Sequence, residues 1–123
     1  MQFIDASHAI DALALDNTAD VTQHADAVRA TRRIALRFPK WTDGRAYSQA
    51  RLLRSRLRYD GELVATGEVL VDMLPLLQRS GFDAVQLRSD QDRAAAERAL
   101  GFFDGHYQAD LVSKLPLYGR PAS

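Results

Sequence analysis

Hydrophobic and polar positions along the chain predict a repeated strand–helix unit. Four short apolar segments have the length and composition of strands: residues 9–15, 33–38, 62–65 and 84–87. The segments between them place apolar residues three or four positions apart, as on one face of a helix. Strands that alternate with helices through short connections favour a parallel sheet with right-handed crossovers.

Local signals mark where the predicted helices begin and end. Asp20 is a typical N-terminal cap for the first helix. The second helix follows Asp43-Gly44, and its apolar stripe consists of Ala46, Ala50, Leu53 and Leu57. The third helix carries Leu70, Met73, Leu74 and Leu77 and stops at Gly81. Pro75 lies inside this third helix, where a missing amide is expected to bend it near residues 71–74. A fourth helix, with Ala96, Leu100 and Phe103 on one face, follows residues 89–92.

These elements predict an α/β fold of four short parallel strands, arranged as an open αβα sandwich with helices on both faces. The alternative is a half-barrel of four βα units, whose bare edges would call for an oligomer such as a dimer. Residues 1–8 are expected to be a flexible N-terminal arm and residues 9–109 a single domain. Residues 110–123 hold no sustained pattern and are expected to be a flexible C-terminal tail.

Composition excludes several classes of protein. Sixteen basic and sixteen acidic residues give a net charge of zero, which argues against a general nucleic-acid or anionic-membrane binder. Absence of cysteine excludes disulfides and thiolate ligands. His8, His24 and His106 lack metal-ligand spacing, so no metal site and no cofactor is predicted. Because the chain shows neither a signal peptide nor a spanning apolar run, we expect a cytoplasmic protein.

Loops that follow parallel strands meet at one edge of a sheet, where ligands bind. At that edge the sequence places the candidate residues Thr42, Asp43, Gly44, Arg45, Ser48, Thr66, Gly67, Glu68, Arg88, Ser89 and Asp90. Helix N-termini and two arginines there would suit a small anion. In the simpler alternative, residues 42–44 only turn the chain and cap a helix, while Arg45 pairs with Glu68 or Asp72. Trp41 and Tyr47 flank this turn and are expected to cover the edge of the core.

The second predicted helix is conspicuously basic. Its arginines are Arg51, Arg54, Arg56 and Arg58. A functional interpretation is a surface for an acidic partner protein, with Arg51, Arg54 and Arg58 as candidate contacts. The simpler alternative is a solvated outer face, because most charged runs on helices are of that kind. Nucleic acid is not expected, since no recognised binding motif or aromatic platform accompanies the arginines.

The segment from Phe38 to Arg88 resembles the bacterial family known as domain of unknown function 934. The similar motifs are Asp43-Gly44-Arg45, Ser48 with Ala50 to Arg54, Gly61 to Leu63, Gly67 to Leu70, and Gly81 to Asp83. The resemblance implies a small cytoplasmic bacterial protein whose gene tends to lie beside genes for assimilatory sulfite reduction.

Three functions stay open at this point. The first is an accessory protein of assimilatory sulfite or sulfate reduction, which binds a small anion or a partner reductase at the loop edge. The second is a small cytosolic enzyme, with Asp43 or Glu68 as acid–base and Arg45 holding an anion. The third is a ligand-binding module without turnover. Since no redox centre is predicted, the first is favoured over the second.

Overall fold

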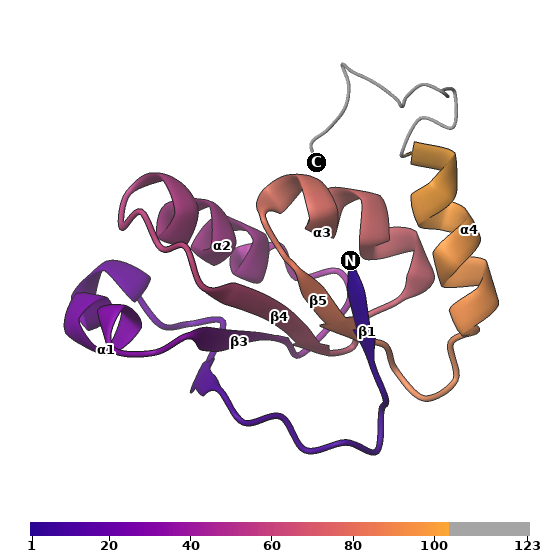
Figure 1. The fold of residues 1–123 in the computed structure, drawn as a ribbon, viewed down its shortest axis with the longest axis horizontal. Coiled ribbons are helices and arrows are strands. Elements are labelled where there is room, and N and C mark those ends of the chain that lie inside the picture. The colour runs from indigo at the N-terminus through magenta and orange to yellow at the C-terminus, as the bar shows by residue number, and fades with distance from the viewer. Residues whose placement is uncertain (104–123) are drawn as a thin grey trace. The chain divides into compact units, whose positions relative to one another are not determined.

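A computed structural model describes residues 1–103, which include a five-stranded parallel sheet (Figure 1). The strands are β1 (Gln2–Ile4), β2 (Leu13–Leu15), β3 (Arg33–Phe38), β4 (Glu62–Gly67) and β5 (Ala84–Gln86). The helical segments are η1 (Val21–His24), α1 (Ala25–Arg29), α2 (Arg45–Ser55), η2 (Val71–Met73), α3 (Leu74–Ser80) and α4 (Arg93–Phe103). The sheet belongs to one compact unit, Met1–Gln91, while α4 belongs to a second. The predicted tail, residues 104–109 of the predicted domain and His106 lie outside the described residues.

The α/β class and the parallel strands are confirmed, but the predicted number of four strands is wrong. The strand order is β1-β5-β4-β3-β2, and every neighbouring pair is parallel. The additional strand, β1, lies within the segment predicted as an N-terminal arm. Three residues are too few to show a period of two, so pairing with β5 defines this strand; Gln2 N donates to the carbonyl of Asp83 at 2.9 Å.

Helical segments of Met1–Gln91 lie on one face of the sheet, not on both as the sandwich prediction required. Strands β2 to β5 are consecutive in the sheet, and right-handed crossovers in one direction place every helix on the same side. In agreement, α2 contacts β3, η1 and α3 (Figure 1). The consecutive order is the one that the half-barrel alternative requires.

A hydrophobic layer joins the helices to the sheet. On β3, Ile34, Leu36 and Phe38 point toward the helices and are fully buried. Their register partners on β4 are Leu63, Ala65 and Gly67. From α2, the predicted stripe residues Ala46, Ala50 and Leu53 are buried against this layer. Two alanines in the first turns of α2 have only methyl groups, so its backbone can lie close to the sheet.

Pro75 does not bend the middle of a helix. It is the second residue of α3, which begins at Leu74 after the short 3-10 segment η2. Amides in the first turn of a helix have no internal acceptor, so proline removes no hydrogen bond there. The predicted helix therefore divides at this point, and its regular part is shorter than the apolar pattern indicated.

The side of the sheet away from α2 and α3 is called the second face below. Residues Arg33, Ala35 and Arg37 of β3 alternate onto it, because their neighbours face the helices. The β1–β2 connection, residues 5–12, runs along this side (Figure 1). Gln86 holds the connection, since its Nε2 donates to the carbonyl oxygens of Asp5 at 2.9 Å and His8 at 2.7 Å.

Candidate functional site

Predicted site residues from separate loops meet at the carboxyl edge of the sheet. Glu68 N, after β4, donates to the carbonyl of Phe38 at the end of β3 at 2.8 Å. Arg88 N, after β5, donates to the carbonyl of Val69 at 3.0 Å. These bonds tie the loops after β3, β4 and β5 side by side. The predicted neighbourhood of the Asp-Gly-Arg and Gly-Glu corners is therefore present in the structure.

Asp43 is the structural centre of the loop after β3. Its Oδ1 accepts a hydrogen bond from Arg45 N at 3.0 Å, which caps the start of α2. The Nε atom of Arg45 lies 3.8 Å from the same oxygen. Arg45 thus pairs weakly with Asp43, and the predicted pair with Glu68 or Asp72 does not form. The capping role proposed as the simpler alternative describes Asp43 well.

Two buried amides that sequence reasoning missed fix the loop after β2 against this corner. Asn17 donates from Nδ2 to Oδ2 of Asp43. Gln49, on α2, donates from Nε2 to the carbonyl oxygens of Asp16 at 2.7 Å and Ala19 at 2.9 Å. Both amides are at least nine-tenths buried. Buried polar side chains need hydrogen-bond partners. A polar residue, Gln49, among the apolar residues of the buried face of α2 was therefore the sequence signal that could have predicted this contact.

Arg88 is engaged by carboxylates of its own chain. It binds Asp90 through Nε–Oδ1 at 2.7 Å and Nη2–Oδ2 at 2.8 Å, and its Nη1 lies 3.7 Å from Glu68 Oε1. Hydrogen bonds from Arg88 lower the pKa of Asp90 to about 2, so this carboxylate is ionised at neutral pH. Arg88 is consequently less available to an external anion than the sequence suggested.

The corner formed by Lys40, Trp41 and Arg45, called the Trp41 corner below, is exposed. Trp41 is 54% exposed, and the Arg45 side chain is 64% exposed. The expectation that Trp41 covers the core edge is wrong. Tyr47 takes that position, with its ring centroid 5.0 Å from that of Phe38.

The remaining edge residues differ in their roles. Thr42, Ser48 and Ser89 are exposed. Gly67 has φ +89, and a Cβ built on it would lie 2.4 Å from the carbonyl oxygen of Phe38. Glycine is required here by the backbone, because side-chain-bearing residues rarely adopt this conformation and the neighbouring strand leaves no room.

Comparison with protein families matches residues 12–118 to a bacterial protein family of unknown function, DUF934. The chain belongs to the DUF934 family. The match starts just before β2, so β1 and most of the β1–β2 connection precede it. Comparisons with curated proteins and with solved structures gave no match.

Arg54 is the centre of a hydrogen-bond network at the opposite edge of the sheet from the Trp41 corner. The guanidinium of Arg54 makes five hydrogen bonds of 2.6–3.1 Å to the following acceptors: the carbonyl oxygens of Tyr59, Gly61 and Gly81 and the carboxylate of Asp83. Asp83 Oδ2 also accepts from Leu63 N at 3.0 Å. The predicted partner contact Arg54 is thus committed to joining α2 with the starts of β4 and β5.

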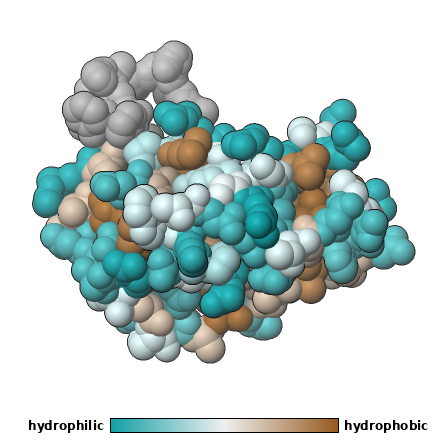
Figure 2. Space-filling view, turned by 180° about the vertical axis from the view of Figure 1, so that it is seen from behind, coloured by the Kyte–Doolittle hydropathy of each residue, from teal (hydrophilic) through white to brown (hydrophobic). Residues whose placement is uncertain are grey.

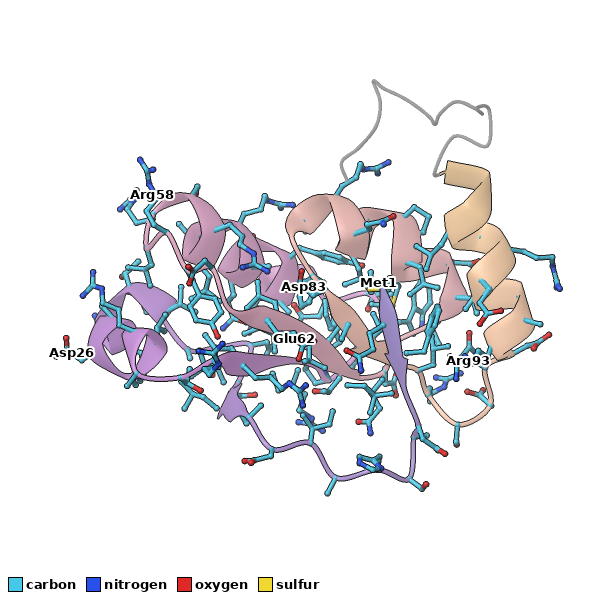
Figure 3. The ribbon with its side chains drawn as sticks, viewed as in Figure 1. Met1, Asp26, Arg58, Glu62, Asp83 and Arg93 are labelled. Atoms are coloured by element: carbon cyan, nitrogen blue, oxygen red, sulfur yellow. The ribbon has the colours of Figure 1, made fainter. Side chains whose placement is uncertain are left out.

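The predicted partner contacts of the basic helix lie away from the loop edge and add no positive charge to it. Arg45 begins α2 and Arg54 lies nine residues later, which is about 14 Å along a helix axis. Arg51 is exposed and donates to Ser80 Oγ at 3.3 Å. Arg58 follows the end of α2, is exposed, and points outward, away from Glu62 and Asp83 (Figure 3). The two predicted surfaces therefore occupy opposite edges in this DUF934 chain.

Arg37 is a candidate functional residue that sequence reasoning missed. It is exposed on β3, between β2 and β4 in the sheet. Interior strands of parallel sheets are normally apolar on both faces. An arginine that alternates with Leu36 and Phe38 in such a strand was the signal that could have identified it.

Within residues 1–103, no group of three or more His, Asp or Glu side chains is placed to hold a metal ion. None of the helices described has the length and apolar character needed to cross a membrane.

On the side of the molecule seen in Figure 2, hydrophobic residues form small separate patches within a largely hydrophilic surface.

Proposed function

We propose that this DUF934 protein is an accessory protein of assimilatory sulfite or sulfate reduction, and that it docks on an acidic surface of a partner reductase through the Trp41 corner. The metabolic setting comes from the family resemblance of the sequence. The docking surface comes from the side chains that the fold leaves exposed at the carboxyl edge.

Exposure of Trp41 is the observation that carries the proposal. The edge of the core is already filled by the Phe38–Tyr47 ring contact, and more than half of the Trp41 surface stays exposed. Exposed Lys40 and Arg45 flank it. Tryptophan and arginine are the side chains that most often dominate binding energy at protein interfaces. An exposed tryptophan with exposed cations before and after it in the chain fits a partner surface with an apolar pocket and carboxylates around it.

The same edge gives less support to a small anion held by the loops. Arg88 is paired with Asp90 and Glu68, and Asp43 Oδ1 accepts from the Arg45 amide. An anion would have to displace these carboxylates, whereas a protein partner needs only the exposed side chains.

Affinity capture from a host grown on sulfate tests the docking proposal. We expect tagged protein to recover sulfite reductase, and Trp41→Ala or Arg45→Ala to reduce the recovery at least tenfold, since hot-spot truncations weaken binding by about 2 kcal/mol or more. Arg29→Ala, at an exposed arginine that ends α1, is the matched control and should leave recovery unchanged.

Thermal unfolding of each variant shows that any loss of recovery is not a loss of fold. Equal recovery by all variants, or no reductase with the unmodified protein in repeated captures, would contradict the proposal.

A further inference from the structure

We infer that the second face of the sheet carries a binding site for a small oxyanion, centred on the guanidinium of Arg37. This site is separate from the Trp41 corner, and each proposal can fail without the other. The ligand class is a carboxylate, sulfate or phosphate with two oxygens free to accept hydrogen bonds.

The side chain of Arg37 has no partner within the described chain. No ion pair or side-chain hydrogen bond among residues 1–103 includes its guanidinium, and the side chain is exposed. Its register partner on β4 is Thr66. Neighbouring strands are about 4.8 Å apart, so the Thr66 hydroxyl lies in the same row as the guanidinium.

Arg33, on the same strand and the same face, provides an internal comparison. Its register partner is Glu62, and the two form an ion pair. Arg37 lies four residues later and is opposite Thr66, a neutral hydroxyl donor. The sheet therefore supplies a carboxylate to one arginine of this face and leaves the other with its five N–H donors available.

The surroundings of Arg37 leave access from the second face. The row of residues next to it on this face is small and apolar: Ala14, Ala35, Val64 and Ala84. Gln86 continues the row of Arg37 and Thr66 on β5, and its amide Nε2 holds the β1–β2 connection. On the β2 side, Asp16 accepts from Thr18 Oγ1 at 3.1 Å. No bulky side chain of the sheet covers the guanidinium.

Topology favours this location over the crevice of a doubly wound sheet. Such a crevice forms where the strand order reverses, and the consecutive order β2 to β5 contains no reversal. Where all helices lie on one side, as in a barrel, ligands meet the carboxyl ends of the strands. Arg37 and Thr66 are each the fifth residue of a six-residue strand, near that end.

An arginine fork and an adjacent hydroxyl have defined chemistry. Two parallel N–H groups match two oxygens of a carboxylate, sulfate or phosphate, and the hydroxyl donates to the same or a third oxygen. No bond is made or broken in this binding, and the positive charge of Arg37 is neutralised by the ligand.

Titration of uniformly ¹⁵N-labelled protein, observed by NMR, tests the inference. Sodium sulfate, phosphate and acetate are added in separate experiments, with sodium chloride at matched ionic strength. We expect saturable shifts of the Arg37 Nε–H and the Thr66 amide with at least one oxyanion at millimolar concentration. Which salt is effective separates a tetrahedral oxyanion from a carboxylate.

Variants make the result specific. Arg37→Gln should weaken the binding at least tenfold, and Thr66→Val several-fold, while Arg32→Gln, at an exposed arginine before the same strand, should leave it unchanged. Trp41→Ala should also retain the shifts, which separates this site from the docking proposal. Equal shifts with chloride, or oxyanion shifts that persist in Arg37→Gln, would overturn the inference.

Discussion

Replacing Arg54 with alanine is expected to lower the free energy of unfolding by about 3 kcal/mol. The guanidinium makes five hydrogen bonds to four residues, and its loss leaves carbonyl oxygens of Gly61 and Gly81 without this donor. Hydrogen bonds to charged groups contribute about 1.5–3 kcal/mol each but are not additive within one network, and the side chain is partly exposed. Urea unfolding followed by circular dichroism measures the change.

Arg56→Ala is the matched control, since Arg56 is an exposed arginine at the end of the same helix. We expect its effect to stay within about 0.5 kcal/mol. If Arg54→Ala were as stable as the control, the network would not hold α2 to the starts of β4 and β5. Arg54 would then be a surface residue again, as the sequence interpretation had it.

Gly67→Ala is expected to destabilise the protein by about 2–4 kcal/mol. The backbone at this position has φ +89, and the added Cβ would lie 2.4 Å from the carbonyl oxygen of Phe38. A left-handed conformation costs roughly 1–2 kcal/mol for a residue with a side chain, and the contact forces β3 and β4 to shift as well. Differential scanning calorimetry should show a clear fall in Tm.

Gly44→Ala is the control for Gly67→Ala. It separates the effect of the backbone conformation at a glycine from the effect of any substitution at this edge. Gly44 lies at the same edge, has φ −91, and a Cβ there would meet no atom within 4 Å. Its effect on the free energy of unfolding should be about 1 kcal/mol or less. Similar losses in the two variants would mean that the close approach of Gly67 to Phe38 does not set the fold at this edge.

Strong periodicity made the central elements predictable. β3 has the predicted bounds, and the predicted stripe of Ala46, Ala50 and Leu53 is the buried side of α2. β1 was missed because three residues carry no usable period, and its partner is distant in sequence. Pro75 was misplaced because an apolar pattern continues through η2 into α3, and only the backbone shows where the regular helix starts.

That the loops would meet at one edge of the sheet was predictable from topology. Which charged side chains are paired and which are not was not predictable. Strand order and register decide which charges become neighbours, and sequence alone does not give them. Arg88 is paired, Arg54 joins three segments, and Arg37 is left opposite a hydroxyl. The predicted list thus contains Arg54, which supports the fold, and omits Arg37, for which the structure shows no ion pair within residues 1–103.

Site-specific photo-cross-linking in the sulfate-grown host tests the docking account most directly. A photo-reactive residue is placed at Thr42, an exposed neighbour of Trp41, or at Arg58, exposed at the far end of α2. We expect a covalent adduct with the reductase from position 42, its loss when Trp41→Ala is added, and none from position 58. An adduct from position 58 with none from position 42 would contradict it.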